Sequence, residues 1–130
     1  MIGLDTSAVI DVFKGNPDVK RFLESNSEPI CATMMTYLEL SFGLDADKRP
    51  HREEAAYYRE FFSAILNFDL TIEACEKAAS VYHTLRKAGK TIGQFDCVIA
   101  AIFLANGVTK ILTRNVKDYK SISQMEVISY

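Results

Sequence analysis

Short apolar runs alternate along the chain with longer stretches in which apolar residues recur every three or four positions. A short apolar run is typical of a strand that is buried on both faces, and the longer spacing is typical of an amphipathic helix. The runs predict five strands, at residues 1–4, 30–33, 66–70, 110–113 and 126–129.

The spaced pattern predicts helices between these strands. We expect Thr6 or Ser7 to cap the first helix and Thr71 to cap a long one that Gly89 ends. The segment 94–105 is apolar on all sides, which indicates a helix buried between the sheet and another layer. The expected helices cover residues 8–14, 18–25, 36–42, 52–65, 72–88 and 94–105.

Strands that alternate with helices form a mostly parallel sheet covered on both faces, so the fold class is α/β. The chain has 130 residues and neither a linker nor an internal repeat. We therefore expect one domain over residues 1–130.

Composition excludes several kinds of function. Fifteen Lys and Arg face seventeen Asp and Glu, so a nucleic-acid partner must be held by a local patch or through a metal. Three Cys without a CxxC pair argue against a disulfide framework and a thiolate zinc site, and favour a reducing compartment. No run approaches the roughly 20 apolar residues of a membrane span, so we expect a cytoplasmic protein with no membrane partner.

Acidic and amide side chains follow several of the predicted strands. Asp5 ends the first strand, Asn115 and Asp118 follow the fourth, and Glu39 and Asp96 open helices. Reactive crevices in parallel sheets lie at the carboxyl ends of the strands. We therefore expect these residues to converge on one rim.

Carboxylates in one cleft repel each other, and no Lys or Arg adjoins Asp5, Glu39 or Asp96 in sequence. A divalent cation with oxygen ligands, Mg²⁺ or Mn²⁺, would neutralise them. Each residue also has an ordinary interpretation when it is taken alone. Asp5 could cap a helix, and Glu39 and Asp96 could balance a helix dipole.

Four blocks resemble the ordered blocks of PIN-domain proteins, and VapC-type toxins in particular. They are residues 2–7 (IGLDTS), 36–40 (TYLEL), 92–101 (IGQFDCVIAA) and 112–119 (LTRNVKDY). The resemblance covers essentially the whole chain. It implies a three-layer α/β/α sandwich with a mostly parallel central sheet, and a Mg²⁺-dependent endoribonuclease that serves as the toxin of a toxin–antitoxin pair. It also implies a cognate VapB-type antitoxin and a homodimer.

The resemblance assigns roles by position. Asp5, Glu39 and Asp96 match the acidic residues that carry metal, while Thr6 and Thr113 match small hydroxyl residues that position the site. Asn115 stands where many relatives have a fourth Asp, and Asp118 could supply that charge. Whether one or two metal ions bind is therefore left open.

An RNA substrate needs cations near the acidic rim. Arg114 and Lys117 belong to the nearer basic group, which also includes Lys110 and Lys120, and a second group lies at residues 86–90. For partners, the expected helix 52–65 carries four clustered aromatic residues, Tyr57, Tyr58, Phe61 and Phe62. They indicate either an antitoxin groove or a dimer face, or else an ordinary division into two core and two surface residues.

Other functions remain open or are disfavoured. A PIN-type RNA-processing nuclease without an antitoxin and a catalytically silent RNA- or protein-binding module are the alternatives, and Asn115 in place of Asp favours the latter. A phosphatase is disfavoured because Asp5 lacks a second Asp two residues later, and no nucleotide-binding glycine motif occurs. Cys97 is better read as a small core residue than as a nucleophile.

Overall fold

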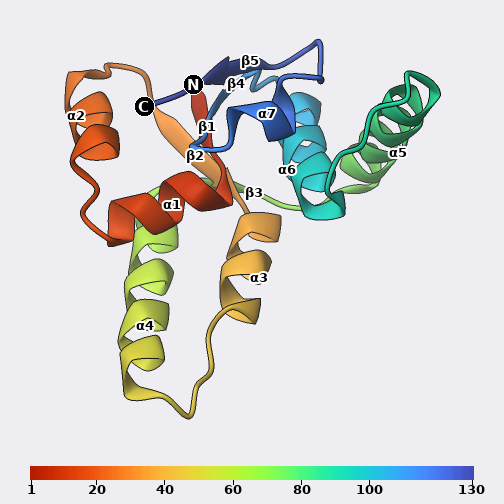
Figure 1. Cartoon of the computed structure of the whole chain (residues 1–130). Coiled ribbons are helices and arrows are strands. Elements are labelled where there is room, and N and C mark those ends of the chain that lie inside the picture. The colour runs from red at the N-terminus through yellow and green to blue at the C-terminus, as the bar shows by residue number, and fades with distance from the viewer.

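A five-stranded, all-parallel sheet with the strand order β3-β2-β1-β4-β5 forms the centre of the computed structural model, which describes all 130 residues (Figure 1). The strands are β1 (Ile2–Leu4), β2 (Ile30–Thr33), β3 (Leu66–Phe68), β4 (Lys110–Leu112) and β5 (Glu126–Ile128). The helices are α1 (Thr6–Phe13), α2 (Pro17–Ser25), α3 (Met34–Phe42), α4 (Arg49–Ala64), α5 (Ile72–Lys87), α6 (Gln94–Ala105) and α7 (Val116–Tyr119).

The helices cover both faces of the sheet, which confirms the expected three-layer α/β/α class. Helices α1, α2 and α4 lie on one side, and α5, α6 and α7 lie on the other (Figure 1). Each side has its own core: Val9, Tyr58 and Leu112 belong to the first, and Ile99 and Phe103 to the second. Helix α6 has the predicted bounds and packs against both β2 and α5, as its apolar surface requires.

The register of the central strands decides where the candidate residues meet. Strand β1 lies between β2 and β4, with Ile2 opposite both Ile30 and Lys110. Because the three strands are parallel and in step, their carboxyl ends share one edge of the sheet. Asp5 and Thr113, which follow β1 and β4, are therefore neighbours.

Several predicted boundaries are wrong. Asp5, and not Thr6 or Ser7, caps α1, since its side chain accepts a hydrogen bond from the Ala8 amide. Helix α3 begins at Met34 under a Thr33 cap, so Glu39 lies in its second turn and not at its opening.

Two further differences have local causes. Helix α4 begins at Arg49 and not at the expected residue 52, because Pro50 lies in its first turn, where a missing amide hydrogen is tolerated. The short helix α7 was not predicted, because four residues give no periodicity to detect. None of the helices is both long and apolar enough to cross a membrane.

Gly3 in β1 is required by close packing of α6 on the sheet. A Cβ at this position would lie 2.5 Å from Cζ of Phe103, whose ring is fully buried. We expect Gly3→Ala to lower the free energy of unfolding by about 1–3 kcal/mol, because the ring has no space to move into. Urea denaturation measures this effect.

Gly43 provides the matched control for that substitution. Its φ is −82°, and a Cβ there would make only ordinary contact, 3.4 Å from the Leu40 carbonyl oxygen. Gly43→Ala should change stability by less than about 0.5 kcal/mol. Equal losses in the two variants would contradict the packing explanation.

Candidate active site

Asp5 is the most buried carboxylate at the shared strand edge, with 3% of its surface exposed. Its Oδ1 accepts hydrogen bonds from the Ala8 amide at 2.9 Å and the Ser7 hydroxyl at 2.7 Å. Its Oδ2 accepts one from the Thr113 hydroxyl at 2.6 Å. Asp5 thus caps α1, and the same side chain also lies at the shared strand edge, where the candidate site was expected.

The ionised form of Asp5 is disfavoured despite these hydrogen bonds. Burial raises the pKa of Asp5 above its ordinary value, and the bonds from Thr113, Ala8 and Ser7 only partly oppose the effect. The charge of Glu39 raises the pKa of Asp5 further. The two carboxylates therefore face each other closely enough to repel.

Glu39 reaches the rim from α3. The Thr6 hydroxyl donates a short hydrogen bond to Oε1 of Glu39, which joins the start of α1 to the middle of α3. Thr6 and Thr113 thus each orient one carboxylate, Glu39 and Asp5 respectively.

Asp96 completes the group from the first turn of α6. The Tyr119 hydroxyl donates to Oδ1 of Asp96 over 3.2 Å. Burial, followed by the charges of Asp118, Glu39 and Asp5, raises the pKa of Asp96 to about 6. The structure therefore brings four acidic side chains from four segments to one rim.

Asn115 and Asp118 differ in their relation to this rim. The Asn115 amide donates to the Thr113 hydroxyl at 2.9 Å, while its side chain is exposed and forms no hydrogen bond. Asp118 is half-buried on α7, and its charge acts on Asp96. Asp118 is thus the acidic residue that this segment adds, and Asn115 supports the loop through its backbone.

The donor set suits a hard divalent cation. No Lys or Arg forms an ion pair with Asp5, Glu39 or Asp96, and no three acidic, His or Cys side chains form a ready-made cage. A cage is not needed, because Mg²⁺ typically uses one or two carboxylates and keeps several waters. A carboxylate has about four acceptor positions, and Asp96 and Glu39 each use only one within the protein.

Arg114 lies beside the rim, but its charge is partly engaged. Its Nη1 is 2.8 Å from Oδ1 of Asp11, while 53% of its side chain remains exposed. Its backbone amide donates to the Ser7 hydroxyl at 3.1 Å, which links Arg114 to Asp5. Lys117 is exposed and forms no ion pair.

Sequence reasoning missed three supporting residues. Asp11 is buried and also accepts a 2.6 Å hydrogen bond from the Tyr130 hydroxyl, so it anchors Arg114. Its signal was a lone acid within the apolar run Ala8–Phe13. Ser7 and Tyr119, which hold Asp5 and Asp96, belong to the family-like blocks but carried no separate signal.

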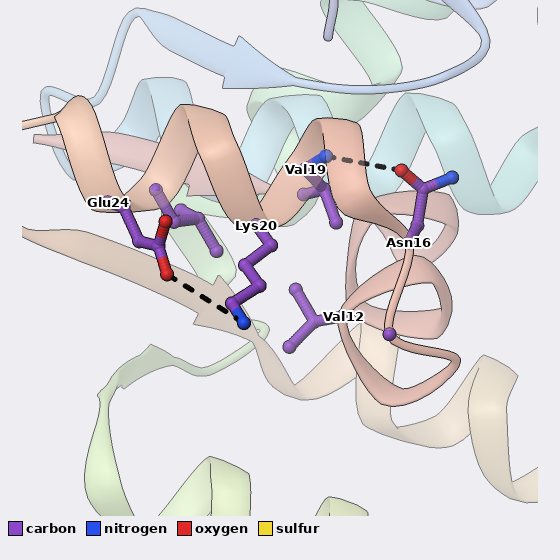
Figure 2. A pocket seen from close by; sticks show the side chains of 7 residues that line it. Val12, Asn16, Val19, Lys20 and Glu24 are labelled. Atoms are coloured by element: carbon purple, nitrogen blue, oxygen red, sulfur yellow. Dashed lines mark hydrogen bonds and ion pairs between the residues drawn. The ribbon is translucent and has the colours of Figure 1, made fainter.

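Two hollows of the surface differ in their relation to the rim. One, between α1 and α2, is lined by residues that include Val12, Val19 and the Lys20–Glu24 ion pair (Figure 2). None of the rim carboxylates borders it. A second hollow, of about 370 Å³, is bordered by Thr6 and Glu39 and therefore opens onto the site.

Comparison with known proteins identifies the family of the chain. The sequence model of the PIN domain matches residues 2–123. The chain belongs to the PIN-domain family. Its curated relatives include a VapC ribonuclease of Sinorhizobium fredii, 30% identical over 93% of this chain and 91% of the relative. They also include a tRNA(fMet)-specific endonuclease VapC of Shigella flexneri, 27% identical over 92% of this chain and 89% of the relative.

Solved structures agree with this assignment of the fold. The crystal structure of VapBC2 from Rickettsia felis, bound to a fragment of its promoter DNA, superposes with a TM-score of 0.85 at 20% identity. The match covers 100% of this chain and 99% of the other. The chain is thus similar in sequence to VapC ribonucleases and has the fold of the matching chain in the VapBC2 structure.

Proposed function

We propose that this PIN-domain chain is a Mg²⁺-dependent endoribonuclease that acts as the toxin of a VapBC-type pair. The observation that carries the proposal is the unneutralised carboxylate rim, where burial, followed by the charges of Asp118, Glu39 and Asp5, raises the pKa of Asp96 to about 6. Such mutual repulsion is typical of a site that holds a cation.

Asp5 and Asp96 would hold the metal, and Glu39 would help to bind it or to orient the attacking water. When bound, Mg²⁺, or Mn²⁺ in its place, supplies an activated water and stabilises negative charge on the phosphodiester oxygens. Thr113 and Thr6 fix the carboxylates of Asp5 and Glu39 through their hydroxyls. Asp118 adds to the negative field around Asp96.

Arg114 and Lys117 would contact the RNA phosphates beside the rim. The bond to Asp11 uses one of the five guanidinium N–H donors of Arg114, which leaves others for a phosphate. Because Asp11 offsets part of its charge, Arg114 serves more to place a phosphate than to attract the strand. Lys117 lacks such a partner and supplies the freer charge.

A cognate VapB-type antitoxin is the proposed protein partner, since several solved neighbours are VapBC complexes. The hollow bordered by Thr6 and Glu39 extends from the rim between α1, α3 and α4, so a segment bound there would block the site. Among the alternatives for the four aromatic residues of α4, the structure has the ordinary division into two core and two surface residues. Tyr58 and Phe62 are buried in the core, and only Tyr57 and Phe61 reach the surface.

We also infer a homodimer, with α3 and α6 at its interface. Leu38 and Phe42 of α3 are 41% and 71% exposed. Phe42 contacts Phe95 of α6, with ring centroids 6.1 Å apart. Exposed apolar clusters of this kind mark association surfaces.

Light scattering tests the dimer and its location. We expect the unsubstituted protein to elute as a dimer and Phe42→Glu as a folded monomer, because a buried unpaired carboxylate disfavours association. Tyr57→Glu on α4 serves as the comparison and should remain dimeric. A monomeric Tyr57→Glu beside a dimeric Phe42→Glu would move the interface to α4.

The ribonuclease proposal is tested with purified chain freed of antitoxin. A structured RNA, such as initiator tRNA, and a single-stranded RNA are incubated with Mg²⁺, Mn²⁺ or EDTA. We expect cleavage with either metal, none in EDTA and none by Asp5→Asn. Absence of cleavage together with absence of metal binding by calorimetry would favour the silent binding module.

A further inference from the structure

A hollow of about 350 Å³ lies at the carboxyl end of α5, and none of the rim carboxylates borders it. We call it the α5 hollow. No acidic residue lines it; its lining residues are Tyr82, Arg86, Gly89, Lys90, Thr91 and Ile92. It is therefore a candidate site for an anionic ligand.

The basic residues of this region are uncompensated. Arg86, Lys87 and Lys90 form no ion pairs, although the whole chain has a net charge of −2. Basic residues at a helix end commonly offset the helix dipole. That role accounts for Arg86 and Lys87 in the last turn of α5, but it does not explain Lys90, which lies beyond the helix. The Nη1 of Arg86 also donates to the Tyr82 hydroxyl at 2.9 Å.

Tyr82 supplies an aromatic wall. Its ring is half-buried and packs against the core around α6, and the guanidinium carbon of Arg86 lies 5.6 Å from the ring centroid. An aromatic ring with adjoining cations is the usual arrangement for stacking a base and holding its phosphates in single-stranded RNA.

Few residues separate the α5 hollow from the carboxylate rim in the sequence. Three peptide steps join Lys90 to Gly93, so their Cα atoms are at most roughly 11 Å apart. At Gly93, a Cβ would lie 3.1 Å from Oδ2 of Asp96. Since a stacked strand advances roughly 3.4 Å per nucleotide, the hollow lies a few nucleotides from the rim.

We propose that the α5 hollow is a subsite for single-stranded RNA, a few nucleotides from the bond that is cut. Tyr82 stacks on a base there, and Arg86 and Lys90 bind the flanking phosphates. This inference rests on the proposed ribonuclease function, because the RNA bound in the α5 hollow is the strand that is cut beside Asp96.

Fluorescence anisotropy in EDTA tests the subsite with labelled single-stranded RNAs of 3 and 12 nucleotides. For the 12-mer, Arg86→Ala/Lys90→Ala should raise Kd roughly tenfold and reduce the logarithmic salt slope by about 1.4, since two phosphates lose their contacts. The 3-mer, which covers only the rim, should be unaffected. Tyr82→Phe should preserve binding of the 12-mer, and Tyr82→Leu should weaken it on the order of fivefold.

Lys20→Ala/Arg21→Ala provides the matched control. It removes the same charge from α2, which lies on the opposite side of the molecule from α5 (Figure 1). Equal weakening in the control, or unchanged 12-mer binding in Arg86→Ala/Lys90→Ala, would overturn the subsite. Cleavage of the 12-mer by the unsubstituted protein with Mg²⁺ is measured in parallel and tests the ribonuclease proposal separately.

Discussion

Asp96→Asn should abolish RNA cleavage and at the same time stabilise the metal-free protein. We expect the cleavage rate to fall on the order of 10³-fold, because a proposed metal ligand and its charge are lost. We also expect the Tm in EDTA at pH 7.5 to rise by roughly 3 °C or more, because a repelled, partly buried charge is removed. Differential scanning fluorimetry and a cleavage assay on the same samples measure both effects.

The pH dependence of that stabilisation follows from the raised pKa. The folded state binds the Asp96 proton up to about pH 6, whereas an ordinary aspartate carboxyl group loses it near pH 3.8. Asp96 therefore reduces stability progressively as the pH rises from about 4 to 6, and fully above that range. The Tm gain of Asp96→Asn should be present at pH 7.5 and absent near pH 4.

Asp18→Asn is the control for these measurements. Asp18 is an exposed acid in the first turn of α2, with an ion pair to Arg21, and it does not border the rim. The Asp18→Asn protein should cleave RNA at the normal rate, and its Tm should not rise. If Asp96→Asn instead lowered the Tm at pH 7.5, the Asp96 carboxylate would stabilise the fold. The proposed repulsion among the rim carboxylates would then be disproved.

The fold was predictable because its signals are local. The central strands β1, β2 and β4 and the apolar stretch Cys97–Ala105 are driven to burial by their composition, and capping by Thr71 and termination at Gly89 follow from residue type. Boundaries failed where two signals competed. Met34 and Met35 carry no capping signal, so the sequence predicts the helix start at Thr36, whereas Thr33 caps the helix in the structure.

The site was predictable only as far as strand order allowed. Parallel strands put Asp5 and Thr113 at one edge, and the expected approach of Glu39, Asp96 and Asp118 to that edge agrees with the charges that act on Asp96. The supporting residues depend on contacts between distant segments, such as Asp11 with Tyr130, 119 positions apart. No local pattern encodes such a pair. The exposure of Phe42 also depends on the packing of distant segments, so the local sequence does not predict it.

Metal binding should weaken steeply as the pH falls through 6. A carboxyl group must lose its proton before it can coordinate a cation, and the pKa of Asp96 is raised to about 6 in the metal-free site. The Kd for Mn²⁺ should therefore rise about tenfold for each pH unit below 6 and change little between pH 7 and 8. Asp5, whose pKa is also raised, can only steepen the dependence.

Isothermal calorimetry in buffers of different ionisation enthalpy tests this competition directly. Mn²⁺ binding should release about half a proton at pH 6, close to one at pH 5 and almost none at pH 8, if Asp96 is the titrating ligand. Asp96→Asn should bind Mn²⁺ more weakly at pH 7.5 but with a flatter pH profile. Asp118→Asn keeps the proposed ligands and removes one repelling charge, so it should lower the pKa of Asp96 and shift the profile toward lower pH. A profile unchanged by both substitutions would mean that another group, and not Asp96, governs access of the metal to the rim.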